Sequence, residues 1–315
     1  MSRCLYCYNE LSDEMTDFHS GCSRKMFGTP VPPQLPYSED QMLQLAEKVI
    51  RSQSTVTGVQ AKLSLNLEKV SKKDVPQRFT ILGLWGGFIL KPPTKQYRYL
   101  PELEDLTMHL AKISGIEVVP HSLIRLSSGT LSYITRRIDR KNEKKIHMED
   151  MCQLTDKLTE HKYKGSYEQI AMAIARYSVN PGLDIVNFFE QLLFSFLTGN
   201  ADMHLKNFSL IDNPGMGYVL SPAYDMIASS LVVKGDEEEL ALTLNGKKKK
   251  LRKKDFLEAI NRFEVDARAI ENIFNRFKNS ADKWDEFINI SFLPDDMKSS
   301  FQNLIKERRE RIYYS

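Results

Sequence analysis

The loop that decides the fold is TGNADMHLKN, residues 198–207. It joins an apolar segment at 183–198, whose hydrophobic residues recur at helical spacing, to a short strand-like run at 208–210. Helical spacing also dominates the sequence from about residue 148 onward. Further helices are predicted at 165–178, 255–279 and 294–312, and two short strands flank the turn 213–215 within 206–228.

The first half of the chain is richer in strand-like sequence. Strands are predicted at 54–66, 78–91, 117–125 and 131–138, with helices at 39–51 and from Pro101 to Gly115. A β-rich half followed by an α-rich half predicts an α+β fold with two lobes. We expect three regions: a Cys/His-containing segment at 1–33, a β-rich N-lobe at 34–147 and a helical C-lobe at 148–315.

Composition excludes several classes of protein. Apolar residues make up 42% of the 315 residues and charged residues 27%, which excludes intrinsic disorder, and the net charge of +3 does not require a nucleic-acid partner. No apolar run reaches the roughly 18 residues that span a bilayer, and the N-terminus lacks the apolar core of a secretion signal. We therefore expect a cytoplasmic protein without membrane contact, whose cysteines are thiols or metal ligands.

Asp202 and Asn207 carry the first candidate chemistry, because four residues separate them on one loop. Phosphoryl transfer needs a carboxylate near the attacking hydroxyl and an oxygen ligand for magnesium, and protein kinases place both as Asp-x4-Asn. A polar turn between helix and strand is an alternative of equal weight from spacing alone. Asp225 follows the strand-like run 217–220, where a second magnesium ligand would lie, and a helix N-cap is its alternative.

Lys91 ends the apolar run 88–90 before two prolines, as a phosphate-binding strand lysine would. Glu104, at the start of the next helix, is its expected partner. The alternative for Lys91 is an exposed strand end, the commoner place for lysine. Gly58 is a candidate for a glycine loop that cradles the phosphates of ATP, although a single glycine is a weak signal. Phosphorylation of Thr55 or Thr57, just before it, would add about −1.5 to −2 charge beside those phosphates.

Two charged or polar clusters leave alternatives open. Cys4-x2-Cys7 followed by His19-x2-Cys22 has the ligand types and pair spacing of a tetrahedral zinc site, and the alternative is a small hydrophobic knuckle with free thiols. The run 247–254 is almost entirely basic. Such a run suits DNA phosphates or an acidic protein, but we favour a hairpin turn that leads into a helix.

Together these segments resemble the HipA family of bacterial toxin kinases over roughly residues 54–260. The resemblance rests on TGVQAK at 57–62, TRRIDR at 135–140, EDMCQ at 149–153, DMHLKNFS at 202–209 and LSPAYD at 220–225. It implies a bilobal, protein-kinase-like fold. The chain departs from the family at Ile138, which replaces the hinge phenylalanine, at Met203, which replaces glycine, and at Thr55 and Thr57, where serine is usual.

The resemblance also implies residue roles. Asp202 would be the base that accepts the substrate hydroxyl proton, and Asn207 and Asp225 would bind Mg²⁺. The implied ATP-binding residues are Gly58, Gln60, Lys62, Lys91, Glu104, Arg136, Ile138, His204 and Lys206. Autophosphorylation, which inactivates kinases of this family, would fall on Ser54, Thr55 or Thr57.

The implied partners are a HipB-like helix-turn-helix antitoxin, with DNA contacted only through it, and a protein substrate such as an aminoacyl-tRNA synthetase or another translation protein. About 50 residues precede the glycine loop, as in the short HipT form, in which a separate HipS-like protein supplies the missing piece. The alternative function is a catalytically silent, kinase-fold binding module that sequesters an antitoxin or operator DNA.

Overall fold

The computed structural model describes residues 2–52, 62–68, 76–81, 86–141, 144–233, 235 and 237–314. The chain divides into two compact units. Unit 1 comprises Met1–Asp105 and Val119–Glu143, and unit 2 comprises Leu106–Val118 and Lys144–Ser315. The three expected regions, with boundaries after residues 33 and 147, stay a prediction. Within the described ranges, no helix is long and apolar enough to cross a membrane.

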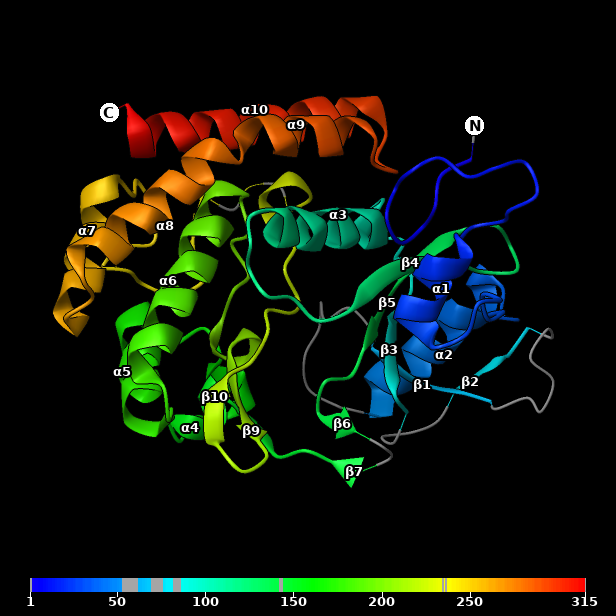
Figure 1. Cartoon of the computed structure of the whole chain (residues 1–315), viewed down its shortest axis with the longest axis horizontal. Coiled ribbons are helices and arrows are strands. Elements are labelled where there is room, and N and C mark those ends of the chain that lie inside the picture. The colour runs from blue at the N-terminus through cyan, green and yellow to red at the C-terminus, as the bar shows by residue number, and fades with distance from the viewer. Residues whose placement is uncertain are drawn as a thin grey trace. The chain divides into compact units, whose positions relative to one another are not determined.

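A five-stranded antiparallel sheet forms the centre of unit 1, in the order β2-β1-β3-β5-β4 (Figure 1). Residues Leu63 and Leu65 of β1 are buried, because alternate side chains of a strand face the core. Two prolines follow Lys91 and cannot continue the hydrogen-bonded ladder. The strands are β1 (Leu63–Leu67), β2 (Phe79–Ile81), β3 (Phe88–Lys91), β4 (His121–Arg125) and β5 (Leu131–Arg136), with the short β6 (Arg140–Lys141) in the same unit.

Helices of unit 1 include α1 (Ser20–Phe27) and α2 (Glu39–Ser52), and α3 (Leu100–Ile113) begins in this unit. Gly28 caps the C-terminus of helix α1, and its φ of 80° lets its N–H donate to the carbonyl of Arg24. Phe27 at the end of α1 packs edge-on against Phe18 and Phe79, with ring centres 5.3 and 5.9 Å away. The N-terminal segment therefore contributes directly to the core of this unit.

Unit 2 is mostly helical and contains a small antiparallel sheet of order β10-β9-β8. The strands of unit 2 are β7 (Lys144–Lys145), which lies outside this sheet, β8 (Met148–Asp150), β9 (Ser209–Asn213) and β10 (Gly217–Leu220). Its helices are α4 (Met151–Leu154), α5 (Tyr167–Tyr177), α6 (Pro181–Leu197), α7 (Lys253–Ile260), α8 (Ala267–Asn279), α9 (Ala281–Asn289) and α10 (Asp295–Tyr313). The strands predicted around the turn 213–215 are confirmed as the β9–β10 hairpin.

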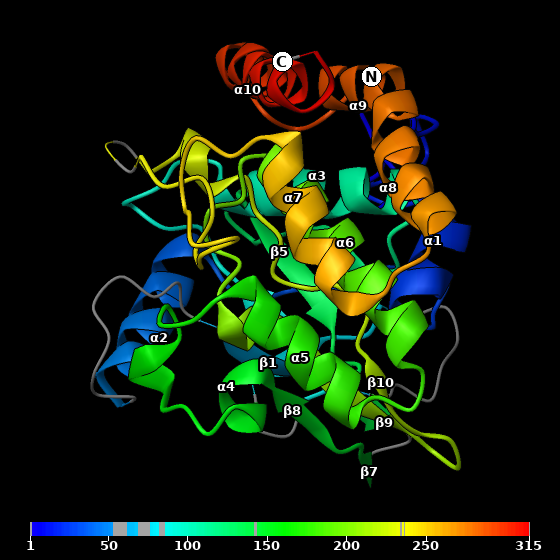
Figure 2. The ribbon, with the colours of Figure 1, turned by 90° about the vertical axis from the view of Figure 1, so that its left-hand side faces the viewer.

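Helix α6 is the core helix of unit 2 and is buried along most of its length. It lies beside α5 in both views of the chain (Figures 1 and 2). Phe194 of α6 packs against Trp284 of α9 at 5.7 Å between ring centres, and the indole N–H donates to Ser114 Oγ over 2.9 Å. The loop that follows α6 therefore leaves a tightly packed core.

The single helix predicted at 255–279 is wrong. Helix α7 ends at Ile260, and Glu264 adopts a left-handed φ of 54°, which an α-helix does not accommodate. Asp266 then accepts hydrogen bonds from the N–H groups of Arg268 and Ala269 and caps the start of α8. The apolar spacing continued across the break, so periodicity alone could not reveal it.

Candidate active site

The loop 198–207 is anchored at its first residues by close packing within unit 2. Gly199 has a φ of 70°, and a Cβ at this position would collide with the Leu304 side chain of α10. Glycine is required here both for the backbone conformation and for the close approach. The N–H of Ala201 donates to Ser229 Oγ over 2.9 Å. These contacts fix the path of the chain just before the candidate base.

Hydrogen bonds inside the loop orient Asp202 and Asn207. The N–H of Asp202 donates to Asn200 Oδ1 over 3.2 Å, and Asn207 Nδ2 donates to the carbonyl of Asp202 over 3.0 Å. Because the amide nitrogen of Asn207 is committed to this carbonyl, its Oδ1 is the atom that can bind a cation. The hydrogen bond from Asn207 to Asp202 therefore closes residues 202–207 into one compact loop.

Tyr163 contacts the candidate base and was not predicted from the sequence. Its hydroxyl donates to Asp202 Oδ1 over 2.7 Å, and its ring packs edge-on against His204 with centres 5.0 Å apart. Burial raises the pKa of Tyr163 above its ordinary value, and the negative charges of Asp202 and, more weakly, Asp225 raise it further. The phenol therefore remains a neutral donor, and both carboxylates lie close enough to act on it electrostatically.

Asp225 adopts a left-handed backbone conformation, with a φ of 61°. Such a conformation costs a non-glycine residue about 1 kcal/mol or more and is often found at functional sites. The N-cap alternative for this aspartate is wrong, because the next helical turn, Ser229–Leu231, has Ala228 at its N-cap position. A carboxylate here and the Asn207 amide oxygen are the hard oxygen donors that Mg²⁺ prefers, so the residues present fit this ion.

Tyr224 ties Asp225 to the loop. Its hydroxyl donates to the carbonyl of Lys206 over 3.0 Å and lies 2.5 Å from Ser209 Oγ, which can donate to it. One half-buried tyrosine thus links the residue before Asp225 to the residue before Asn207. This link explains how two segments separated in sequence are held in a defined relation.

Lys206 forms an ion pair that the sequence motifs did not indicate. Its Nζ lies 2.6 Å from Asp150 Oδ2, and Asp150 also accepts the N–H of Gln153 over 3.0 Å as the N-cap of α4. The segment 149–153 therefore holds the lysine of the candidate catalytic loop. Nucleotide binding by Lys206 and His204 stays a prediction.

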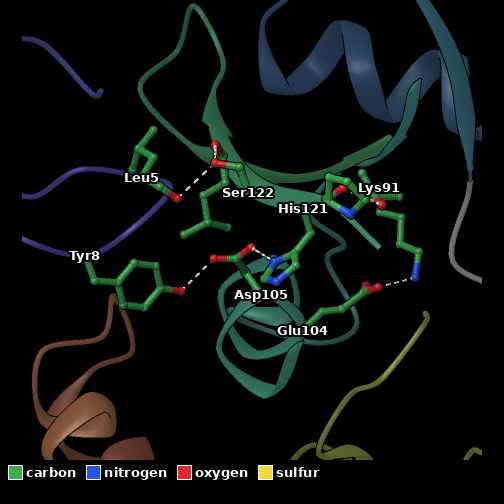
Figure 3. A network of polar contacts seen from close by, with 10 residues as sticks. Leu5, Tyr8, Lys91, Glu104, Asp105, His121 and Ser122 are labelled. Carbon is green, nitrogen blue, oxygen red and sulfur yellow. Dashed lines mark hydrogen bonds and ion pairs between the residues drawn. The ribbon is translucent and has the colours of Figure 1, made fainter. Parts of the chain in front are cut away.

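Lys91 and Glu104 form a buried ion pair in unit 1 (Figure 3). Lys91 Nζ lies 2.5 Å from Glu104 Oε1, and the two side chains are 5% and 1% exposed. The ammonium also lies 5.4 Å from the centre of the Tyr133 ring on β5. The alternative of an exposed strand end is therefore wrong, and the expected partner is present. Phosphate binding by Lys91 stays a prediction.

In the segment 135–140, the expected nucleotide-binding hinge, the side chain and the backbone N–H of Arg136 already form hydrogen bonds within unit 1. The guanidinium of Arg136 donates to the carbonyls of Lys25 and Met26 at the end of α1, over 3.2 and 2.5 Å. The backbone N–H of Arg136 donates to the Pro120 carbonyl over 2.9 Å. This N–H is therefore already hydrogen-bonded, and adenine binding by the backbone around Arg136 to Ile138 stays a prediction.

The expected glycine loop cannot be placed. Lys62 is exposed and directly precedes β1. The residues of this loop that lie outside the described part of the chain are Ser54, Thr55, Thr57, Gly58 and Gln60. Their roles in ATP binding and autophosphorylation stay predictions.

The basic run 247–254 begins in a tight turn. Leu244 and Lys247 exchange backbone hydrogen bonds of 2.8 and 2.9 Å, and α7 starts at Lys253. Lys247 pairs with Asp255 at 2.6 Å, and Lys248 with Glu238 at 3.0 Å. The interpretation as a turn before a helix is confirmed, and neighbouring carboxylates already balance part of its charge.

Comparisons with known proteins show which family this chain resembles. A family model described as "HipA-like C-terminal domain" matches residues 54–284. The chain is 34% identical over 207 residues to "Putative kinase Y4dM" of Sinorhizobium fredii, which covers 62% of this chain and 49% of that protein. It is 26% identical over 171 residues to "Serine/threonine-protein kinase toxin HipA" of Shewanella oneidensis, covering 48% and 39% respectively. The chain thus spans about half the length or less of these curated relatives.

A solved structure gives the corresponding likeness in three dimensions. It is the Shewanella oneidensis complex of HipA, HipB and operator DNA, which matches with a TM-score of 0.69 at 21% identity over 88% of this chain and 71% of that one. At this identity the likeness shows the fold alone, and that fold is the α+β, HipA-like, kinase-like fold that the sequence motifs predicted. Because the family model covers well over half of its residues, the chain belongs to the HipA-like C-terminal domain family.

Proposed function

We propose that this chain is an ATP-dependent protein kinase that phosphorylates serine or threonine hydroxyls. The observation that carries the proposal is the loop 198–207, on which Asp202 and Asn207 are joined by a hydrogen bond and Asp225 acts on the same tyrosine as Asp202. A base, an amide oxygen and a second carboxylate are the groups that phosphoryl transfer requires. The names of the curated relatives support the same activity.

In the proposed reaction, the substrate hydroxyl oxygen forms a bond to the γ-phosphorus of ATP while the bond from that phosphorus to the bridging oxygen breaks. ADP leaves, and the hydroxyl proton passes to the carboxylate of Asp202. Because the Tyr163 hydroxyl donates to Oδ1, it holds the carboxylate in one orientation and leaves Oδ2 as the oxygen to accept the proton.

The remaining residues would bind the nucleotide. Asn207 Oδ1 and Asp225 would hold Mg²⁺, which when bound neutralises charge on the phosphates. Lys91, oriented by Glu104, would contact the α- and β-phosphates. In this role its burial is an advantage, because a fixed ammonium loses little conformational freedom when a phosphate binds.

We also propose the biological setting that the family resemblance implies. The chain would be the toxin of a toxin–antitoxin system, bound and neutralised by a HipB-like antitoxin, which would also provide the contact with DNA. The solved complex from Shewanella oneidensis contains HipA, HipB and operator DNA, which supports this idea. A HipS-like protein, an aminoacyl-tRNA synthetase as substrate, and autophosphorylation at Ser54, Thr55 or Thr57 belong to the same proposal.

The test is incorporation of label from radioactive ATP with Mg²⁺, into the chain itself and into a proteome depleted of nucleotides. Asp202→Asn should lower the rate about 10²–10⁴-fold, the range for removal of a general base. Asp282→Asn makes the same chemical change on an exposed turn of α9 and should leave the rate unchanged. Phosphoproteomics of cells that express each variant would identify the substrate.

Two results would reject the proposal. Equal labelling by the wild type and Asp202→Asn would remove Asp202 as the base. If the wild type incorporates no label, although it is folded and mass spectrometry finds it unphosphorylated, the chain is instead a silent binding module.

A further inference from the structure

Four possible metal ligands gather at the N-terminus of unit 1, far in sequence from the candidate catalytic loop. Cys4 and Cys7 lie on one turn, and His19 and Cys22 lie at the start of α1. One ligand atom from each side chain lies within 4.8 Å of the other three. His19 Nδ1 is 3.5 Å from Cys7 Sγ and 3.8 Å from Cys22 Sγ.

These separations match a tetrahedral site. With Zn–S bonds of about 2.3 Å and Zn–N bonds of about 2.0–2.1 Å, neighbouring ligand atoms of a tetrahedron lie about 3.5–3.8 Å apart. The two nitrogen–sulfur distances, 3.5 and 3.8 Å, fall in this range. Only small side-chain movements would bring the remaining pairs, at up to 4.8 Å, to the same separation.

The orientation of His19 suits a metal ligand. Its Nε2 lies 3.0 Å from the carbonyl oxygen of Glu10, which can only accept a hydrogen bond. Nε2 therefore carries the hydrogen, and in the neutral ring Nδ1 presents its lone pair to the sulfur atoms. Metal-bound histidines commonly have this arrangement, with the second ring nitrogen donating to a backbone carbonyl. A cation among the four side chains would bind this lone pair and the three sulfur atoms together.

The backbone of the first turn is shaped for its two cysteines. The N–H of Tyr8 donates to the carbonyl of Cys4 over 2.9 Å, and the N–H of Cys4 donates to the carbonyl of Asn9 over 2.9 Å. Tyr8 itself has a left-handed φ of 63°, which costs a tyrosine free energy that other interactions must offset. These hydrogen bonds hold Cys4 and Cys7 on the same turn, although the backbone conformation of Tyr8 is unfavourable.

The same turn is bound to the sheet of unit 1 (Figure 3). The carbonyl of Leu5 accepts hydrogen bonds from the N–H of Leu123 over 3.2 Å and from Ser122 Oγ over 3.0 Å. The buried hydroxyl of Tyr8 donates to Asp105 Oδ2 over 2.8 Å, and Asp105 Oδ1 lies 2.7 Å from His121 Nδ1. Asp105 directly follows Glu104, the partner of Lys91.

We propose that Cys4, Cys7, His19 and Cys22 bind one Zn²⁺ in a structural site that fastens the N-terminal segment to β4 and the start of α3. Three sulfur ligands and one imidazole are the donors that select zinc over Mg²⁺ or Ca²⁺. Four protein ligands leave no open position for substrate, so the ion is structural. The zinc site is independent of the proposed kinase activity, because none of its ligands belongs to the candidate catalytic loop.

The test is the metal content of the full chain, purified without added metal and measured by inductively coupled plasma mass spectrometry. About one zinc per chain is expected, released in step with the modification of three thiols by a mercurial reagent. Cys7→Ser and Cys22→Ser should lose most of the zinc. Cys152→Ser is the matched control, since it removes a buried thiol of unit 2 and should retain zinc.

A second measurement uses the wild-type sequence, so its result does not depend on whether the variants fold. Zinc is removed under denaturing, reducing conditions, and the chain is refolded with Co²⁺, which should give the visible bands of a tetrahedral ion and a near-ultraviolet sulfur-to-metal charge-transfer band. A folded wild-type chain that contains no zinc and shows no such bands would overturn the proposal. Zinc retained equally by Cys7→Ser, Cys22→Ser and Cys152→Ser would overturn it as well.

Discussion

The buried ion pair between Lys91 and Glu104 allows stability and activity to be separated. Lys91→Met leaves the Glu104 carboxylate in a site where only 1% of its side chain is exposed, so water cannot replace the ammonium. Breaking a buried pair from one side costs about 3–5 kcal/mol. The whole free energy of unfolding of a typical domain is only about 5–15 kcal/mol. We therefore expect Lys91→Met to be folded but markedly less stable.

Removing both charges should have a different effect on stability. In Lys91→Met/Glu104→Leu no charge is left buried, and we expect most of the lost stability to return, because such pairs are often replaceable by apolar residues. The phosphate binding proposed for Lys91 should not return, since the double variant lacks the ammonium. The matched control is Lys249→Met, whose partner Glu237 is 83% exposed, and it should change stability by less than about 1 kcal/mol.

The assay combines urea denaturation, followed by tryptophan fluorescence and circular dichroism, with binding of ATP and labelling by it. The structure requires a large loss of stability in Lys91→Met and recovery in the double variant, and the proposed phosphate contact of Lys91 requires that neither variant is active. A loss below about 1 kcal/mol in Lys91→Met would show that water reaches the pair. Full activity in the double variant would refute the assignment of Lys91 to the phosphates.

Two further predictions concern stability within each unit. Gly199→Ala should destabilise unit 2 by about 1–3 kcal/mol, because the new Cβ would collide with Leu304 and the φ of 70° is unfavourable for alanine. Adding Leu304→Ala to the same chain should restore part of the lost stability, and thermal unfolding measures both effects. Burial, with a smaller contribution from Asp105, raises the pKa of Glu102 from 4.5 to about 7, so the folded state binds more protons than the unfolded state between these values. Stability should therefore fall as pH rises through this window, by roughly 3 kcal/mol at most, and urea titrations of Glu102→Gln should lack this fall if the assignment is right.

Local patterns in the sequence predicted the elements that carry the candidate site. The helical spacing of 183–198 appears as α6, and the turn at 213–215 joins β9 to β10. The prolines after Lys91 end β3 where expected. These predictions succeeded because helix and strand periods, and the conformational limits of proline and glycine, act over a few residues.

Other features depended on residues that are distant in the chain. The break between α7 and α8, the contact of Tyr163 with Asp202 and the pairing of Lys206 with Asp150 follow no local period. The Arg136 guanidinium is occupied by the end of α1, more than 100 residues earlier, which the hinge motif could not indicate.

The sequence by itself therefore determined which residue types stand at which spacing: Asp202 and Asn207 on one loop, Lys91 at a strand end, and two pairs of zinc-type ligands. Only the tertiary structure decided that Lys91 is buried against Glu104, that Tyr163 orients the candidate base, and that the four N-terminal ligands converge. The physical reason is that spacing reflects the geometry of a single turn or strand. Burial and side-chain partners are set by the packing of segments that meet only when the chain has folded.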